Sequence, residues 1–330
     1  SLQRCIWTAL FPCTSLCDFV SLFHGRDHVQ KPLIFDIKRY SINDGPGIRV
    51  TIFLKGCPLN CQWCHNPESI SPKIQKLFTA SKCIGCGECC RVCPVQACTL
   101  TPEGIVTDET LCTLCGKCAE VCPTLATEMS GAYRSVEELI EIIEKERPFF
   151  DQSGGGVTFS GGEPLLYPEF LLELLDACGR KNIHRAIDTS GYVKTAPLLE
   201  VAEHTDLFLY DLKMIDAERH KRYTGVDNHL ILINLKVLAE SGARIQVRIP
   251  LIGGVNDDVI SVKAFAAFVA GLAGKSKEVN LLPFHDVAKG KDLKLGQERD
   301  LSALQEPGPE SVAHALEIFG EYGLTANVGG

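Results

Sequence analysis

The distribution of cysteine constrains this chain more than any other feature. The 330 residues include 17 cysteines, and most of them lie between residues 57 and 122. Disulfide scaffolds of secreted proteins are usually shorter and spread their cysteines along the chain. Bunched C-x-x-C spacings in a chain of this length are typical of metal or iron–sulfur ligands in a reducing compartment.

Residues 81–127 hold two copies of one cysteine unit with the spacing C-x2-C-x2-C-x3-C-P. In two-cluster ferredoxins the fourth cysteine of each run binds the other cluster. A pair of zinc sites is the alternative, and the duplicated fourth Cys-Pro disfavours it. Cys90 and Cys98 fall outside the pattern and are predicted to be buried cysteines. The spacing therefore predicts two [4Fe-4S] clusters, one on Cys83, Cys86, Cys89 and Cys122 and the other on Cys93, Cys112, Cys115 and Cys118.

A third group, Cys57-x3-Cys61-x2-Cys64, supplies only three cysteines. A cube of four irons bound by three thiolates keeps one iron without a protein ligand. An open position is what a substrate-binding metal centre needs. Taken alone, the spacing also allows a zinc site completed by His65.

From residue 33 onward, short β-rich runs alternate with amphipathic stretches. The predicted strands are Val50–Leu54, Val157–Ser160, Ala186–Thr189, Leu207–Leu212, Ile245–Pro250 and Val279–Pro283. The predicted helices are Ser135–Lys145, Pro168–Lys181, Ala196–His204, His229–Ser241, Val259–Leu272 and Glu310–Tyr322. This alternation is typical of βαβ units around a parallel sheet. It predicts an α/β fold, a partial (β/α)6 TIM-like barrel.

Domain boundaries follow from the interruption of this pattern. We expect residues 31–80 and 128–330 to form the barrel, and residues 81–127 to form an inserted module similar to a bacterial ferredoxin. In such barrels the chemistry collects at the carboxyl ends of the strands. The residues that follow the predicted strands fit an active face: Gly56-Cys57, Gly161-Gly162-Glu163-Pro164, Ser190-Gly191, Lys213, Pro250 and His285.

Charge and hydropathy exclude several classes of partner. Lys and Arg number 33 against 41 Asp and Glu, and no basic run occurs, so we expect no nucleic-acid partner. No stretch of 18 apolar residues is present, so we expect no membrane span. Residues 1–30 lack the charged start and clean apolar run of a signal peptide, and we treat them as an N-terminal extension outside the fold.

The triplet C-x3-C-x2-C at the end of a first barrel strand resembles the motif of the radical S-adenosylmethionine (SAM) superfamily. The flanking segments Tyr40–Arg49 and Trp63–Glu68 resemble the signature of one branch, the glycyl-radical enzyme activating enzymes. The match runs from about Ile34 to the C-terminus and includes the ferredoxin-like insert, which the shortest members, such as the pyruvate formate-lyase activator, lack. The resemblance implies an oxidoreductase that cleaves SAM reductively to a 5′-deoxyadenosyl radical. That radical would take a hydrogen from a glycine of a partner enzyme.

The resemblance also implies roles for individual residues at the strand ends. Gly162 would contact the methionyl amino group of SAM, Lys213 its carboxylate and His285 its adenosyl portion. Asp188, Thr189 and Asp211 would hold a monovalent cation, Na+ or K+. The complete set of predicted cofactor-binding residues is Trp63, Cys64, His65, Gly162, Glu163, Asp188, Asp211, Leu212, Lys213, Arg248 and His285.

One position departs from the family pattern. Family members often carry a Lys-Tyr pair six residues after the histidine, and here Lys291 is followed by Asp292. The departure puts a tyrosine-dependent role in doubt and does not touch the cluster assignment.

The implied cofactors are three [4Fe-4S] clusters and SAM. The implied partners are a glycyl-radical enzyme with a C-terminal glycine loop, and an electron donor such as flavodoxin or ferredoxin, in the cytoplasm of an anaerobe. A radical SAM enzyme acting on a small molecule or peptide is one alternative, which the Asp44-Gly-Pro-Gly47 signature disfavours. A ferredoxin-like carrier without chemistry of its own is another, which the strand-end motifs disfavour.

Overall fold

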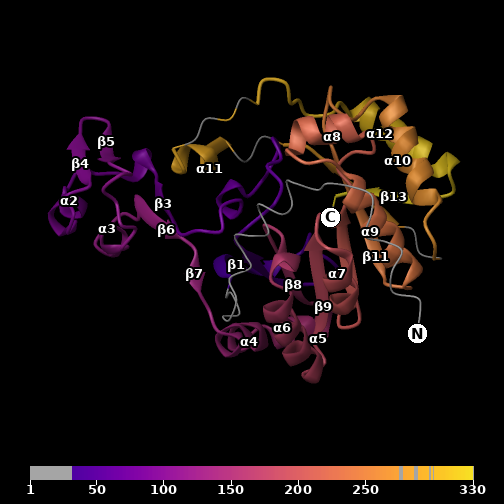
Figure 1. Ribbon diagram of the computed structural model, residues 1–330, viewed down its shortest axis with the longest axis horizontal. Coiled ribbons are helices and arrows are strands. Elements are labelled where there is room, and N and C mark those ends of the chain that lie inside the picture. Colours follow the sequence, from indigo (N-terminus) through magenta and orange to yellow (C-terminus); the bar gives the residue numbers. More distant parts are fainter. Residues whose placement is uncertain (1–31, 275–277, 286–288, 297–298, 300, 330) are drawn as a thin grey trace, which may run out of the picture. The chain divides into compact units, whose positions relative to one another are not determined.

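The computed structural model describes residues 32–274, 278–285, 289–296, 299 and 301–329. Figure 1 shows the arrangement of its helices and strands. The predicted N-terminal extension, residues 1–30, lies outside the described residues. Residues 32–330 form one compact unit.

A nine-stranded sheet organises this unit, in the order β13-β12-β11-β10-β9-β8-β2-β1-β7. All neighbours from β2 to β13 are parallel, whereas β1 pairs antiparallel with β2 and β7. The six predicted strands are confirmed, and they are β2 (Arg49–Leu54), β8 (Gly156–Gly161), β9 (His184–Thr189), β10 (Leu207–Asp211), β11 (Ile245–Leu251) and β12 (Glu278–Pro283). The sequence prediction missed β1 (Leu33–Ser41), β7 (Ala132–Tyr133) and β13 (Thr325–Val328).

The missed strands lie at the two ends of the sheet, where apolar runs are not required. Strand β2 is buried at every position, while β1 and β13 are mostly half-buried or exposed. Continuous apolar runs mark strands covered on both faces, so the central strands were visible in the sequence and the outer ones were not. With β13 included, the parallel part of the sheet from β2 to β13 contains seven strands, one more than predicted.

The six predicted helices are also confirmed, with ends that differ by at most two residues. They are α4 (Val136–Glu144), α6 (Pro168–Arg180), α7 (Thr195–Ala202), α9 (His229–Glu240), α10 (Val259–Ala270) and α12 (Pro309–Glu321). Ser135 caps α4 through a capping box with Glu138. The prediction missed α5 (Arg147–Ser153), α8 (Ala217–Thr224) and α11 (Lys289–Lys294), which are short or predominantly polar.

A two-stranded antiparallel ribbon of β3 (Gln75–Phe78) and β6 (Thr127–Ser130) frames the cysteine-rich segment. Between these strands lie η2 (Ala80–Lys82), α2 (Glu88–Val92), the hairpin β4 (Cys98–Thr101)–β5 (Gly104–Thr107), and α3 (Lys117–Glu120). The predicted boundaries of the insert, 81 and 127, fall at the end of this ribbon.

Lys55 connects the ribbon to the barrel. Its side chain is fully buried, and its ammonium lies 2.9 Å from Gln75 Oε1 and 3.3 Å from Ser130 Oγ. It also donates to the backbone oxygen of Glu68 in η1 (Pro67–Ser69). One buried cation thus joins the end of β2 to both strands that carry the insert. None of the helices in the described ranges is long and apolar enough to cross a membrane.

Candidate active site

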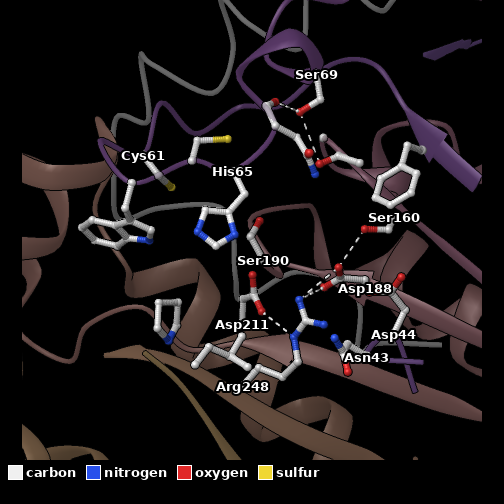
Figure 2. Close-up of a pocket in the computed structure, with 18 of the residues that line it drawn as sticks. Asn43, Asp44, Cys61, His65, Ser69, Ser160, Asp188, Ser190, Asp211 and Arg248 are labelled. Carbon is white, nitrogen blue, oxygen red and sulfur yellow. Dashed lines mark hydrogen bonds and ion pairs between the residues drawn. The ribbon is translucent and has the colours of Figure 1, made fainter. Parts of the chain in front are cut away.

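A cavity of about 740 Å³ opens at the carboxyl ends of the parallel strands. The three thiols of the cysteine loop lie in its wall, and Figure 2 shows charged side chains from several strand ends pointing into it. The structure therefore brings the cysteine triplet together with the following residues that the sequence singled out: Trp63, His65, Gly162, Asp188, Thr189, Asp211, Lys213 and Arg248.

Backbone hydrogen bonds hold the cysteine loop on both sides. Cys57 N donates to Ile70 O at 3.1 Å, next to η1. Asn60 N and Gln62 N donate to carbonyl groups at the end of α8, at 2.8 and 3.0 Å. The chain itself therefore holds the loop on both sides through backbone hydrogen bonds.

Arg299 supplies a third anchor that the sequence did not reveal. Its guanidinium donates to the carbonyl oxygens of Cys61 and Cys64 at 3.1 Å each, and to that of Gln62 at 3.2 Å. Asp292, only 3% exposed, holds the guanidinium in an ion pair of 2.7 Å. The aspartate that stands where the family often has tyrosine thus orients the arginine that holds the cysteine loop.

The thiols of the loop are poor acids in the free protein. Burial raises the pKa of Cys57 and Cys64, and raises that of Cys61 to about 12. Binding of a metal centre therefore has to displace protons from these thiols. Within the described part of the chain, no three His, Cys, Asp or Glu side chains are grouped to hold a single metal ion.

Four charged side chains form a balanced network in the opposite wall. Arg248 donates to Asp188 at 3.0 Å and to Asp211 at 3.1 Å, and Lys213 lies 2.8 Å from Asp211. Burial raises the pKa of Asp188 to about 6, whereas Lys213 and Arg248 outweigh burial and lower the pKa of Asp211. Two cations and two carboxylates in one cavity suit a zwitterionic ligand with its own amino and carboxylate groups.

Glu163 has a different position from the one predicted. It is fully buried and does not line the cavity. Its carboxylate accepts from Ser190 Oγ at 2.6 Å, from Ser190 N at 2.9 Å and from Thr189 Oγ1 at 2.7 Å. It therefore ties the end of β8 to the end of β9 and positions the Asp188-Thr189-Ser190 segment.

Gly162 is a glycine because the chain itself passes close by. A Cβ at this position would lie 2.0 Å from Gly56 O. The neighbouring amide of Glu163 donates to that same oxygen at 2.7 Å. Besides the predicted contact with SAM, the residue after β8 thus approaches the start of the cysteine loop closely.

Two further predicted residues lie outside the wall of the cavity. Leu212 is fully buried, and its backbone amide donates to Arg248 O at 2.8 Å. His285 has a side chain 60% exposed, with its ring nitrogen 3.1 Å from Glu306. Sequence reasoning missed Ser160, which donates to Asp188 at 2.7 Å, because a serine at the end of a strand carries no distinctive signal.

The Tyr40–Arg49 signature forms part of the rim of the cavity. Arg49 is fully buried and donates to Thr158 Oγ1 at 2.7 Å and to Val157 O at 2.5 Å. Thr158 Oγ1 in turn donates to Asp44 O at 2.6 Å. These bonds pin the loop that places Asn43 and Asp44 at the cavity, as Figure 2 shows.

The insert contains two smaller cysteine-lined cavities. The first has Cys83, Cys86, Cys89 and Cys122 in its wall. The second has Cys93, Cys112, Cys115 and Cys118, together with Cys98. Each cavity thus takes its fourth predicted ligand from the other copy of the repeat. Cys98 is buried as predicted, and Cys90 is half-buried.

Comparison with known proteins identifies the class to which this fold and cysteine loop belong. Residues 51–266 match the model of the radical SAM superfamily. A radical SAM methyltransferase from Sphaerobacter thermophilus has a similar fold, with a TM-score of 0.51 and 14% identity over 97% of this chain and 82% of that one.

Curated relatives narrow the class further. The trans-4-hydroxy-L-proline dehydratase activating enzyme of Clostridioides difficile is 43% identical, over 91% of this chain and 100% of the relative. The choline trimethylamine-lyase activating enzyme of Oleidesulfovibrio alaskensis is 42% identical, over 82% and 88%. The benzylsuccinate synthase activating enzyme of Thauera aromatica is 39% identical, over 91% and 93%. The chain belongs to the glycyl-radical enzyme activating enzymes of the radical SAM superfamily.

Proposed function

We propose that this protein activates a glycyl-radical enzyme by abstracting a hydrogen from one of its glycines. The observation that carries the proposal is the large cavity in which three thiols face a balanced set of charged groups. When a [4Fe-4S] cluster and SAM are bound, one electron splits the S–C5′ bond, and the resulting 5′-deoxyadenosyl radical takes the glycine hydrogen. Family membership supports this activity, since the relatives are activators of several such enzymes.

The roles of the cavity residues follow from their chemistry. Cys57, Cys61 and Cys64 would hold the reactive cluster and leave one iron for SAM. Arg248 and Lys213 are placed to pair with the SAM carboxylate, while Trp63 and His65 line the same cavity. Glu163 and Arg299 act as positioning residues, because each holds a segment that carries cavity residues.

Further cofactors belong to the proposal. The eight cysteines of the insert would hold two auxiliary [4Fe-4S] clusters within residues 81–127, supported by the two four-cysteine cavities. We also propose a monovalent cation, Na+ or K+, at Asp188, Thr189 and Asp211. It would bind when SAM draws Arg248 or Lys213 away from the two carboxylates that they now neutralise.

The partners are proposed by class. Relatives named for different glycyl-radical enzymes match this chain almost equally well, which supports a glycyl-radical partner that presents a glycine loop. A flavodoxin or ferredoxin would supply the electron. The bunched C-x-x-C spacings are typical of ligands in a reducing compartment, so the proposed location is the cytoplasm of an anaerobe.

Anaerobic reconstitution tests the activity directly. With SAM and dithionite, the protein should release 5′-deoxyadenosine, and a co-incubated partner should show the doublet of a glycyl radical by electron paramagnetic resonance (EPR). Release of 5′-deoxyadenosine without a doublet on any glycyl-radical partner would favour a small-molecule or peptide substrate. An intact cluster that forms no 5′-deoxyadenosine would overturn the proposal.

A further inference from the structure

The ribbon β3–β6 places the two cysteine cavities of the insert in a definite order. The pair Gln75↔Ser130 receives the ammonium of Lys55, two residues before Cys57. The next pair, Lys76↔Met129, lines the cavity of Cys93, Cys112, Cys115 and Cys118. The pair Phe78↔Thr127 lines the cavity of Cys83, Cys86, Cys89 and Cys122.

A strand advances about 3.3 Å per residue, so the pairs that line the two cavities are roughly 7 Å apart along the ribbon. The cavity of Cys93, Cys112, Cys115 and Cys118 lies next to the end tied to the cysteine loop, and we call it the inner cavity. The other four-cysteine cavity is then the outer one.

The two cavities provide similar backbone donors to their sulfur atoms. Ala97 N donates to Cys93 Sγ at 3.2 Å in the inner cavity. Thr127 N donates to Cys122 Sγ at 3.5 Å in the outer cavity. Hydrogen bonds to sulfur are one of the factors that set the potential of a cluster, and this factor differs little between the two.

Charge, by contrast, differs between the cavities. The half-buried Lys76 lines the inner cavity together with Lys117, and the ammonium of Lys76 lies 3.3 Å from Cys98 Sγ and 2.7 Å from Thr107 Oγ1. No carboxylate within the described ranges pairs with it. In the outer cavity the charged wall residue is Glu88, which is paired with Arg91. A fixed positive charge therefore stands beside the inner thiolates alone.

Resting on the proposed cluster assignments, we propose that the inner cluster is the immediate electron donor to the cluster on Cys57, Cys61 and Cys64, and that Lys76 tunes its potential. A cluster bound by four thiolates is anionic, and reduction adds one more negative charge. A nearby ammonium stabilises the reduced form and makes the inner cluster easier to reduce than the outer one.

The electron balance of this path is simple. One electron leaves a flavodoxin- or ferredoxin-type donor, which is oxidised by one electron. It would pass from a cluster on the outer cysteines to one on the inner cysteines and then to the cluster on Cys57, Cys61 and Cys64, where cleavage of SAM would consume it. Cys98 is not a ligand in this scheme, and it holds the ammonium of Lys76 at the cavity wall.

The test is a redox titration of the reconstituted protein, followed by EPR. In Lys76→Met, the midpoint of one auxiliary cluster should become more negative by about 59 mV, a tenfold fall in its reduced-to-oxidised ratio. Lys76→Arg keeps the charge and should restore the midpoint. Lys145→Met, an exposed lysine on the barrel, is the matched control and should shift nothing.

Ligand variants assign the shifted signal. It should disappear in Cys115→Ala and persist in Cys86→Ala. The magnetic interaction between the reactive cluster and its nearest reduced neighbour should likewise survive Cys86→Ala and be lost in Cys115→Ala.

The inference is overturned if Lys76→Met keeps about twelve irons per chain, four for each cube, yet leaves every midpoint unchanged. It is equally overturned if the shifted signal, or the interaction with the reactive cluster, depends on Cys86. A protein that cleaves SAM but holds only about four irons would instead refute the auxiliary clusters of the proposed function.

Discussion

Cysteines line one cavity in the barrel and two in the insert, but these cavities differ in volume and in the charged residues of their walls. The barrel cavity measures about 740 Å³, against about 20 Å³ for each cavity of the insert. Asp188, Asp211, Lys213 and Arg248 line the barrel cavity, whereas each of the other two has at least four cysteines in its wall. The proposed reactive centre thus has three thiols beside a large charged cavity, whereas each proposed auxiliary cluster has four thiols around a small one.

The largest effect should appear when one cysteine is replaced in each region and the two variants are compared. Cys61→Ala should abolish dithionite-driven formation of 5′-deoxyadenosine, because the reactive cluster loses one of its three ligands. Cys86→Ala should retain that reaction and lose roughly a third of the iron, since it disrupts one of three cubes. Chromatography of the product and iron analysis measure both results.

Cys178→Ala serves as the control, because Cys178 is buried in the barrel away from all three cavities. If Cys61→Ala formed as much 5′-deoxyadenosine as the unsubstituted protein, the proposed difference in role between the barrel and the insert would be wrong.

The network of Asp188, Asp211, Lys213 and Arg248 lies in the wall of the barrel cavity. The substitution Arg248→Met would leave the two carboxylates without the cation that they share. Breaking a buried pair on one side typically costs about 3–5 kcal/mol. Denaturant unfolding of the cluster-free protein should show a loss of this size. Arg134→Met, at an exposed pair with Glu138, should cost about 0–1 kcal/mol. Equal losses at the two sites would contradict the network.

The clamp of Arg299 acts on the open cysteine loop and on neither loop of the insert. Arg299→Met removes donors to three carbonyl groups, and bonds from a charged group contribute about 1.5–3 kcal/mol. Hydrogen exchange at residues 57–66 should accelerate, and a chelator should remove iron from the reactive site faster than from the insert. Asp292→Asn should show the same pattern more weakly. Uniform iron loss from all sites would argue against the clamp.

A smaller effect is expected at the contact between β8 and the cysteine loop. Gly162→Ala forces a methyl group against Gly56 O, and overpacking of this kind costs about 1–3 kcal/mol. Gly320→Ala, in an exposed turn of α12 with open space around it, should instead stabilise the protein by about 0.5–1 kcal/mol. Thermal unfolding of both variants measures the difference. If Gly162→Ala left the stability unchanged, the cysteine loop would be able to shift away from the added methyl group.

Much of the fold could be predicted from the sequence, because buried strands and helices produce regular patterns of apolar residues. The six central strands and their helices were visible as apolar runs and amphipathic stretches. Strand β13 and helix α8 were not, since one lies at the sheet edge and the other is largely polar. The site was predicted through strand-end residues, which parallel topology brings to one edge of the sheet.

The position of individual side chains could not be predicted in the same way. Glu163 follows the strand-end rule and still turns away from the cavity, because Thr189 and Ser190 offer it buried donors. His285 also follows a strand, and its side chain meets Glu306 instead. The orientation of each side chain depends on hydrogen-bond or ion-pair partners that other parts of the fold supply.

The sequence by itself determined how many thiolates each centre can receive, because ligand spacing is a local property of the chain. It also determined which segments form the central parallel strands, because those segments are apolar runs. The tertiary structure alone decided which groups surround those thiolates. Arg299 reaches Cys61 across 238 residues, and Lys76 in β3 meets Cys98 in β4, a strand of a different sheet. Contacts of this kind arise from packing, and no local pattern encodes them.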